Sequence, residues 1–366
     1  MSRSPLLRPT LLPGLPRVWR GSHTLQLGLD PGRALLLDLP DPRAARVLDL
    51  LDGTRSERAV LRAAIGWHVP PEQARVLIDT LRLAGLLLPG PSFLPASLPA
   101  TTRRRLAPEA AALALARPPR QIPPEGSTAS QRPARILQRR VSARISVAGR
   151  GRLGAPIAVA LAEAGVGHVH PDLPGAVTEA DLPGGPLRPA DLGLPRRAAI
   201  AAAVQRAAPG TETRPMRRGT AELTIQLGYE QPVALLAAGH ASRRQPHLAV
   251  ALREGVAVIG PLVPATGGPC LNCLEMHRRD RDAGWPGGLA WLGDDNPEPS
   301  TIATLLAAVA YATAEALAFL DGGSPETIGA AVEIAGPGHF RRRSWPPHPG
   351  CGCFARSSHR HARRPR

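Results

Sequence analysis

The sequence predicts a two-domain α/β protein, in which a small α+β domain precedes a Rossmann-like domain closed by a zinc site. Three observations predict this fold class. Short strands and helices alternate over residues 18–90, a G-x-G-x-x-G turn lies between a strand and a helix near residue 150, and two close pairs of cysteines follow. The chain has 366 residues, of which 43% are hydrophobic, and this is enough for two cores.

The predicted N-terminal domain, residues 1–90, resembles a winged helix in the order of its elements. The expected elements are strands at 24–29 and 34–38, helices at 42–51, 55–65 and 70–84, and a closing strand at 86–88. A winged helix can place a helix in a DNA groove or add a peptide strand to its sheet edge. The third helix carries both acidic and basic side chains, which favours a peptide over a phosphate backbone.

Composition distinguishes the regions around the predicted Rossmann-like domain at 141–355. Residues 91–140 are rich in proline and arginine and are predicted as a linker, with a short helix at 107–116, and residues 356–366 as a basic disordered tail. The apolar helix expected at Ile302–Leu320 contains Glu315, so a buried helix explains it better than a membrane span. The N-terminus lacks the features of a signal peptide, and the expected location is the cytoplasm, with no membrane partner.

The chain is strongly basic, with a net charge of +16 that comes entirely from arginine, since the sequence contains no lysine. This bias, together with abundant alanine, proline and glycine, is typical of a GC-rich genome. A basic surface still attracts acidic partners, either nucleic acid or an acidic peptide. Charge alone is a weak argument for nucleic acid, and we do not expect it as the main partner.

The clearest local pattern is the glycine turn at 149–154. A strand is expected at 143–148, a helix at 155–164 and a second strand at 168–170, which is the context that the motif requires. Glycines there allow a tight turn and close helix–strand packing, and they expose N–H groups that favour anions. Further along the chain, strands are expected at 223–227, 255–260 and 329–334, and helical or turn segments at 232–239 and 242–252.

The four cysteines form two close pairs, Cys270-x-x-Cys273 and Cys351-x-Cys353. Together they supply the four thiolates that structural zinc prefers, and a reducing cytoplasm favours metal over disulfides. Two disulfides or four unrelated thiols are the alternatives, and His277 or His348 could replace one cysteine as a ligand. A zinc site that uses all four sulfurs leaves none to act as a nucleophile.

The glycine turn, the following AGVG and the paired cysteines resemble the ThiF/MoeB/ubiquitin-activating superfamily over residues 141–355. A more specific resemblance rests on GPLVPATGGPCLNCLEMHRRDRDAGWP (260–286) and RRRSWPPHPGCGC (341–353), which are similar to ThiF-like proteins of azole- and azoline-peptide biosynthesis. The resemblance implies a domain that recognises the leader segment of a precursor peptide. It also implies a YcaO-type cyclodehydratase as partner, which would itself use ATP.

Adenylating members of this superfamily surround ATP and Mg²⁺ with an arginine, a lysine and an aspartate, which neutralise developing charge. Here Gly184 stands where that arginine is expected, the chain has no lysine, and Tyr229 stands at the metal-binding aspartate. Glu230 could replace the aspartate. Asp172 could bind the ribose, although an ungapped reading places Leu173 or Gly175 there. These departures lead to the hypothesis of a vestigial nucleotide site, formed by Gly149, Gly151, Gly154, Asp172 and Glu230. The alternative is that the glycine turn is retained only as a structural βα turn.

We therefore predict an accessory protein that binds a leader peptide and presents it to a cyclodehydratase, with structural zinc and no catalytic residue of its own. One alternative is an active ATP-dependent adenylyltransferase that holds ATP at the glycine turn and magnesium at Glu230. A second alternative is a winged-helix regulator that binds DNA. A homodimer stays open. The charged motif at 277–282 with Trp285 is predicted to have a structural or docking role rather than to supply a base.

Overall fold

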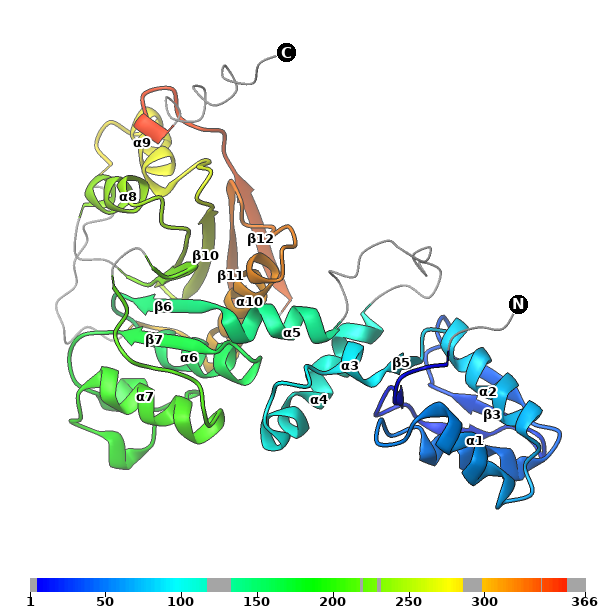
Figure 1. Ribbon diagram of the computed structural model, residues 1–366. Coiled ribbons are helices and arrows are strands. Elements are labelled where there is room, and N and C mark those ends of the chain that lie inside the picture. The colour runs from blue at the N-terminus through cyan, green and yellow to red at the C-terminus, as the bar shows by residue number, and fades with distance from the viewer. Residues whose placement is uncertain are drawn as a thin grey trace, which may run out of the picture. The chain divides into compact units, whose positions relative to one another are not determined.

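The chain divides into two compact units in the computed structural model (Figure 1). Unit 1 comprises Met1–Gln138 and unit 2 comprises Arg139–Arg366, and each unit is described by itself. The structure describes residues 5–116, 133–217, 220–228, 232–285, 298–336 and 338–353. The predicted tail at 356–366 lies outside these residues.

Unit 1 contains a three-stranded antiparallel sheet in the order β2-β3-β4, and β1 pairs separately with β5. The strands are β1 (Pro9–Leu11), β2 (Arg17–Trp19), β3 (Thr24–Leu27), β4 (Leu35–Asp38) and β5 (Leu87–Pro89). The helices are the 3-10 helix η1 (Pro42–Leu50), α1 (Glu57–Ile65) and α2 (Pro71–Leu83). The sequence sets their starts, because Asp41 and Ser56 accept backbone N–H groups as caps and Pro71 occupies the first position of α2.

The segment predicted as a linker is helical over much of its described length. This corrects the linker prediction for 91–140, whereas the short helix predicted at 107–116 is confirmed as the second half of a longer helix. It contains α3 (Gly90–Phe93), α4 (Ala100–Leu115) and α5 (Pro133–Ser142), while residues 117–132 lie outside the described part. Leu106, Ala110 and Leu137 are almost fully buried in the core of unit 1. Burial of these few apolar side chains stabilises the helices, which the high proline and arginine content of the segment does not predict.

Unit 2 is built on a seven-stranded sheet in the order β12-β11-β10-β9-β8-β6-β7. Its strands are β6 (Arg144–Ala148), β7 (His168–Asp172), β8 (Leu223–Gln226), β9 (His247–Arg253), β10 (Val256–Val263), β11 (Ala330–Gly336) and β12 (His339–Ser344). The strands from β7 to β9 are parallel, and those from β9 to β12 are antiparallel. The chain runs from β6 to β7 on one side and returns to β8 on the other, so the end of β6 is a topological switch point.

The helices of unit 2 cover this sheet in two groups (Figure 1). They are α6 (Gly154–Glu163), α7 (Arg196–Ala207), α8 (Val233–Ser242), α9 (Leu271–Arg281) and α10 (Ile302–Leu320). Helix α6 packs against both α7 and α10, whereas α8 packs against α9. Helix α10 is the one described helix that is long and apolar enough to cross a membrane, but Leu305, Ala308 and Ala312 bury one of its faces in the core.

Several elements of unit 2 differ from the sequence prediction. The segment 242–252, predicted as helical or turn, contains most of β9. The prediction was wrong because nearly every side chain of this strand is buried, so the sequence lacks the alternation of polar and apolar residues that indicates a strand. Helices α7 and α9 and strand β12 were not predicted. Strand β12 is exposed along its whole length and carries three arginines, so it has no apolar pattern to reveal it.

Candidate functional site

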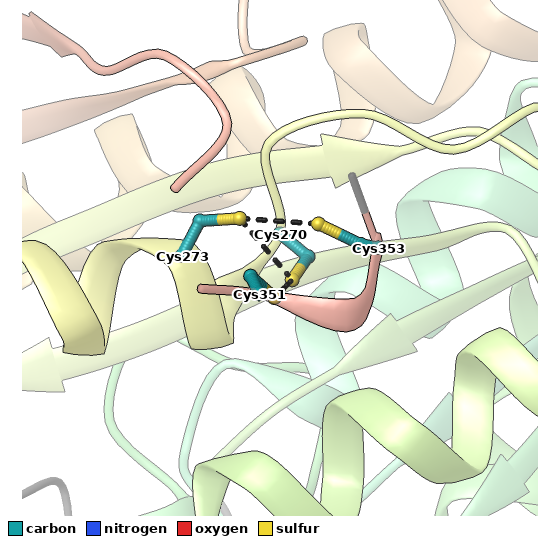
Figure 2. Close-up of side chains that lie close together, drawn as sticks. All are labelled: Cys270, Cys273, Cys351 and Cys353. Carbon is teal, nitrogen blue, oxygen red and sulfur yellow. Dashed lines mark hydrogen bonds between the residues drawn. The ribbon is translucent and has the colours of Figure 1, made fainter. Parts of the chain in front are cut away.

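The four cysteines converge at one point in unit 2, as predicted (Figure 2). Cys270 is the N-cap of α9 and Cys273 lies in its first turn, while Cys351 and Cys353 lie on the segment after β12. The Sγ atoms of Cys270 and Cys273 are 3.8 Å apart, those of Cys270 and Cys351 are 3.8 Å apart, and those of Cys273 and Cys353 are 3.1 Å apart. All four sulfurs lie within 4.8 Å of one another.

These separations fit a tetrahedral metal site better than disulfides. With Zn–S bonds of about 2.3 Å, the edge of a regular tetrahedron of sulfurs is about 3.8 Å. Two of the three separations have this length, and all three are far above the ~2.05 Å of an S–S bond. Cys270, Cys273 and Cys351 are buried, whereas Cys353 is half-buried. The residues present therefore have the chemistry and the spacing to hold one zinc ion.

The thiols also perturb one another. The hydrogen bond from the Cys270 thiol to Cys273 raises the pKa of Cys270 to about 12, and the same hydrogen bond lowers the pKa of Cys273. The neighbouring thiols Cys270 and Cys273 also raise the pKa of Cys353. In the metal-free cluster these hydrogen bonds therefore favour a thiolate at Cys273 over one at Cys270 or Cys353, whereas a divalent cation would stabilise several thiolates together.

A second group of side chains ties the C-terminal segment to helix α9. His348 Nε2 lies 2.8 Å from Asp280 Oδ2, and His348 Nδ1 accepts the backbone N–H of Gly350 at 3.0 Å. His277 Nε2 lies 3.0 Å from the carbonyl oxygen of Pro346, and its ring meets His348 edge-on at 4.9 Å. These contacts assign His277 and His348 to supporting the cysteine segment rather than to replacing a sulfur ligand.

The charged motif after Cys273 is also structural in its contacts. Glu275 is buried, accepts the indole N–H of Trp285 and lies 3.6 Å from the guanidinium of Arg278. Arg278 in turn stacks 5.1 Å above the Trp285 ring. These pairings connect the end of α9 back to its beginning and agree with the predicted structural role.

The glycine turn lies at the end of β6, where each of its three glycines permits a close approach. A Cβ on Gly149 would lie 2.6 Å from the carbonyl oxygen of Gly228, after β8. A Cβ on Gly154 would lie 2.3 Å from Leu173 and 2.8 Å from Leu227, so this glycine allows α6 to pack tightly on the sheet. Gly149 and Gly151 have φ of +104° and +133°, conformations that other residues rarely adopt.

The turn already holds an acidic side chain, that of Glu298. Glu298 Oε2 accepts the backbone N–H of Arg152 at 2.8 Å, and the Arg152 guanidinium donates to the carbonyl oxygen of Glu298 at 3.2 Å. Burial raises the pKa of Glu298, and the hydrogen bond from Arg152 opposes that shift. Sequence reasoning missed this residue, because nothing in its surroundings, Asn296-Pro-Glu-Pro-Ser300, marks it as a partner of a turn 146 positions earlier.

Asp172 ends β7 directly beside the turn, where its backbone carbonyl accepts the N–H of Gly149 at 3.3 Å. Its carboxylate pairs with Arg197. The alternatives from the ungapped reading fit a polar role less well: Leu173 is buried beneath Gly154, and Gly175 has no side chain. Of the predicted nucleotide-site residues, the structure brings together the three glycines and Asp172. Tyr229 and Glu230 lie outside the described residues.

The position expected for a phosphate-binding arginine cannot hold one without a local change. Gly184 has φ of +72°, and a Cβ there would lie 3.2 Å from Ile302. Two other arginines, which sequence reasoning did not single out, lie close to the turn. Arg152 and Arg196 both act electrostatically on Glu298, and Arg196 also pairs with Asp181 at 2.9 Å.

Comparison with known proteins defines the fold. No family model and no curated protein matches the sequence. The crystal structure of E. coli MccB with AMPCPP and MccA has a TM-score of 0.58 and 14% identity, covering 94% of this chain and 99% of that chain. The E. coli MccB structure with ATP has a TM-score of 0.57 and 13% identity, with the same two coverages. A crystal structure of PaaA has a TM-score of 0.58 and 15% identity, covering 91% and 98%.

The structural similarity spans both units. Because the sequence identity is only 13–15%, the similarity establishes the fold alone. A further similar structure is described as the microcin C7 biosynthetic enzyme MccB in complex with N-formylated MccA. The chain therefore has the fold of MccB and PaaA, the ThiF-like fold that its glycine turn and cysteine pairs predicted.

Proposed function

We propose that this protein binds a precursor peptide in ribosomal peptide biosynthesis and presents it to a YcaO-type cyclodehydratase, without adenylating the peptide itself. The observation that carries the proposal is the fold match, which covers 94% of this chain and includes MccB solved with MccA, a precursor peptide. The sequence resemblance to ThiF-like partner proteins of azole and azoline biosynthesis supplies the choice of cyclodehydratase.

Unit 1 offers a surface that suits an extended peptide. Within the described residues β2 and β4 each pair only with β3, so this sheet has two edges that can accept a further strand. Val18, Gln26 and Leu36 lie opposite one another across the three strands. Val18 is 40% exposed and Leu36 is 51% exposed, so an apolar side chain lies at each edge. A peptide strand would gain backbone hydrogen bonds and cover one of these side chains.

Unit 2 would supply a rigid scaffold closed by zinc. Cys270, Cys273, Cys351 and Cys353 would hold the ion, which would join the start of α9 to the segment after β12. Such a site is structural, because its four ligand positions are all protein sulfurs and leave none for substrate or water.

The nucleotide site is proposed to be degenerate. The chain has no lysine to neutralise phosphates, and Gly184 stands where an arginine is expected. The backbone N–H of Arg152 already donates a hydrogen bond to the carboxylate of Glu298. Catalysis of adenylation depends on stabilising the charge that develops on the phosphates. A turn that retains its backbone shape but carries a carboxylate lacks that stabilisation.

One observation favours the second candidate, an active adenylyltransferase. MccB is solved with ATP, and here Arg152 and Arg196 lie close to the corresponding type of glycine turn. Pyrophosphate exchange by the purified full-length chain with ATP, Mg²⁺ and candidate peptides separates the two functions. The accessory role predicts no exchange above background. Clear exchange that Glu230→Gln abolishes would establish the adenylyltransferase instead.

Peptide capture is tested by the affinity of the full-length chain for a candidate precursor peptide, sought among the short open reading frames near its gene. We expect Val18→Asp or Leu36→Asp to weaken binding at least about tenfold, because a charge would be buried against the added strand. Leu235→Asp, at a position 63% exposed in unit 2, is the matched control and should bind normally. No binding by the wild type, or equal binding by both edge variants and the control, would contradict peptide capture at this sheet.

A further inference from the structure

We propose that Glu298 is a built-in competitor of nucleotide, whose carboxylate occupies the phosphate position of the glycine turn. The inference refines the nucleotide site of the proposed function, and it does not require peptide capture. It predicts that any nucleotide must displace this side chain before its phosphates can reach the turn.

The geometry of the turn places the carboxylate where a phosphate would be held. Glu298 Oε2 accepts the N–H of Arg152 at 2.8 Å, two residues before α6 begins at Gly154. Backbone N–H groups at the start of a helix are a common binding site for phosphate and carboxylate alike. The two ligands therefore compete for the same donor.

The absence of a side chain on Gly151 lets the carboxylate approach this closely. A Cβ there would lie 2.9 Å from Oε1 and 3.1 Å from Oε2 of Glu298. In a dinucleotide-binding turn the glycine at this place admits the phosphate for the same steric reason. In this chain the space that Gly151 leaves is taken up by Glu298.

Nearby charges support an anion at this point. The Arg152 guanidinium donates to the carbonyl oxygen of Glu298 at 3.2 Å, so one residue holds Glu298 through both its backbone and its side chain. Arg196 adds positive potential, and Asp181, which Arg196 contacts, partly offsets it. This field would hold the phosphates of a nucleotide equally well once the carboxylate had left.

The energetic consequence is a reduced apparent affinity. If the competing side chain occupies the turn for most of the time, the apparent dissociation constant rises by the inverse of the fraction of open molecules. A charge-assisted hydrogen bond in a partly buried site makes a tenfold or larger effect reasonable.

The test measures equilibrium binding of ATP to the full-length chain by isothermal titration calorimetry, with and without Mg²⁺. We expect Glu298→Ala to bind ATP at least about tenfold more tightly than the wild type. Glu298→Gln, which keeps the shape but removes the charge, should also bind more tightly. Glu222→Gln changes an exposed glutamate of unit 2 and should leave the affinity unchanged. Circular dichroism and the urea midpoint check that each variant is folded.

Equal or weaker ATP binding by both folded Glu298 variants would overturn the inference. That result would leave peptide capture untouched, since capture is measured separately on unit 1. Conversely, tighter ATP binding together with a gain of pyrophosphate exchange would confirm the competitor and refute the degenerate site. Tighter ATP binding without exchange would confirm both the competing role of Glu298 and the degenerate nucleotide site.

Discussion

Substitution of Cys351 by serine tests the zinc site most directly in structural terms. Cys351 is buried, and its Sγ lies 3.8 Å from that of Cys270, so serine would place a poorer ligand at one corner of the predicted tetrahedron. We expect the wild type to contain about one zinc per chain by plasma emission spectrometry. The Cys351→Ser variant should lose most of it.

The expected loss of stability depends on how much of unit 2 the zinc site holds together. Structural zinc contributes roughly 10–16 kcal/mol in isolated zinc fingers, and most domains have a total stability of about 5–15 kcal/mol. Here unit 2 has a large core of its own, so we expect a loss of about 2–5 kcal/mol and local release of the segment after β12 rather than global unfolding. Urea unfolding and hydrogen exchange of residues 345–353 would measure the two effects.

The matched control is Asn272→Ala, which removes the hydrogen bond of 3.4 Å to the Cys351 sulfur but leaves all four ligands. This variant should retain zinc with a weaker affinity. A metal-free wild-type protein in which residues 345–353 stay protected from exchange, or a Cys351→Ser variant with unchanged stability, would contradict the zinc site.

Three further predictions concern unit 2. Asp321→Asn removes one charge from the pairing with the buried guanidinium of Arg140 and should destabilise the unit by about 3 kcal/mol in urea. The stacked rings of His240 and His247 are buried, and burial lowers their pKa values to about 3 and about 4. Because the unfolded chain binds these protons near pH 6.5, stability should be constant above that pH and fall below it, by up to about 2.7 kcal/mol per pH unit toward pH 4. Gly154→Ala should cost at least about 2 kcal/mol, because its Cβ would lie 2.3 Å from Leu173.

Each of these predictions has a defined contradiction. Asp49→Asn removes an exposed ion pair in unit 1 and should change stability by less than about 1 kcal/mol. A loss of stability from Asp321→Asn that is no larger than this would contradict the prediction. A urea midpoint independent of pH between 6.5 and 4.5 would contradict the neutral histidines. Gly21→Ala has no neighbour within 4 Å and should be almost neutral, which isolates the steric cost at Gly154.

The parts of the fold that the sequence predicts well are those where local chemistry decides the conformation. The glycine turn with strand β6 and helix α6 was correct to within a residue, because glycines and hydrophobic runs specify it locally. The cysteine cluster was also correct, since two close pairs restrict where four sulfurs can meet.

The parts that were missed depend on distant contacts. Only the second half of helix α4 was predicted, as a short helix at 107–116, because its arginines and Pro108 mask three buried apolar side chains. Strand β9 was predicted as helical or turn because both of its faces are buried, so its sequence lacks the alternation of polar and apolar residues. Glu298 reaches the glycine turn across 146 residues, and no local pattern encodes that contact.

The central claim, that the chain captures a peptide and does not activate it, is tested by one measurement with two readouts on the same sample. The full-length protein is titrated with the candidate precursor peptide in the presence of ATP and Mg²⁺, and pyrophosphate exchange is followed after saturation. We expect saturable peptide binding with exchange at background. Exchange that rises with peptide occupancy would contradict it, as would a complete absence of binding.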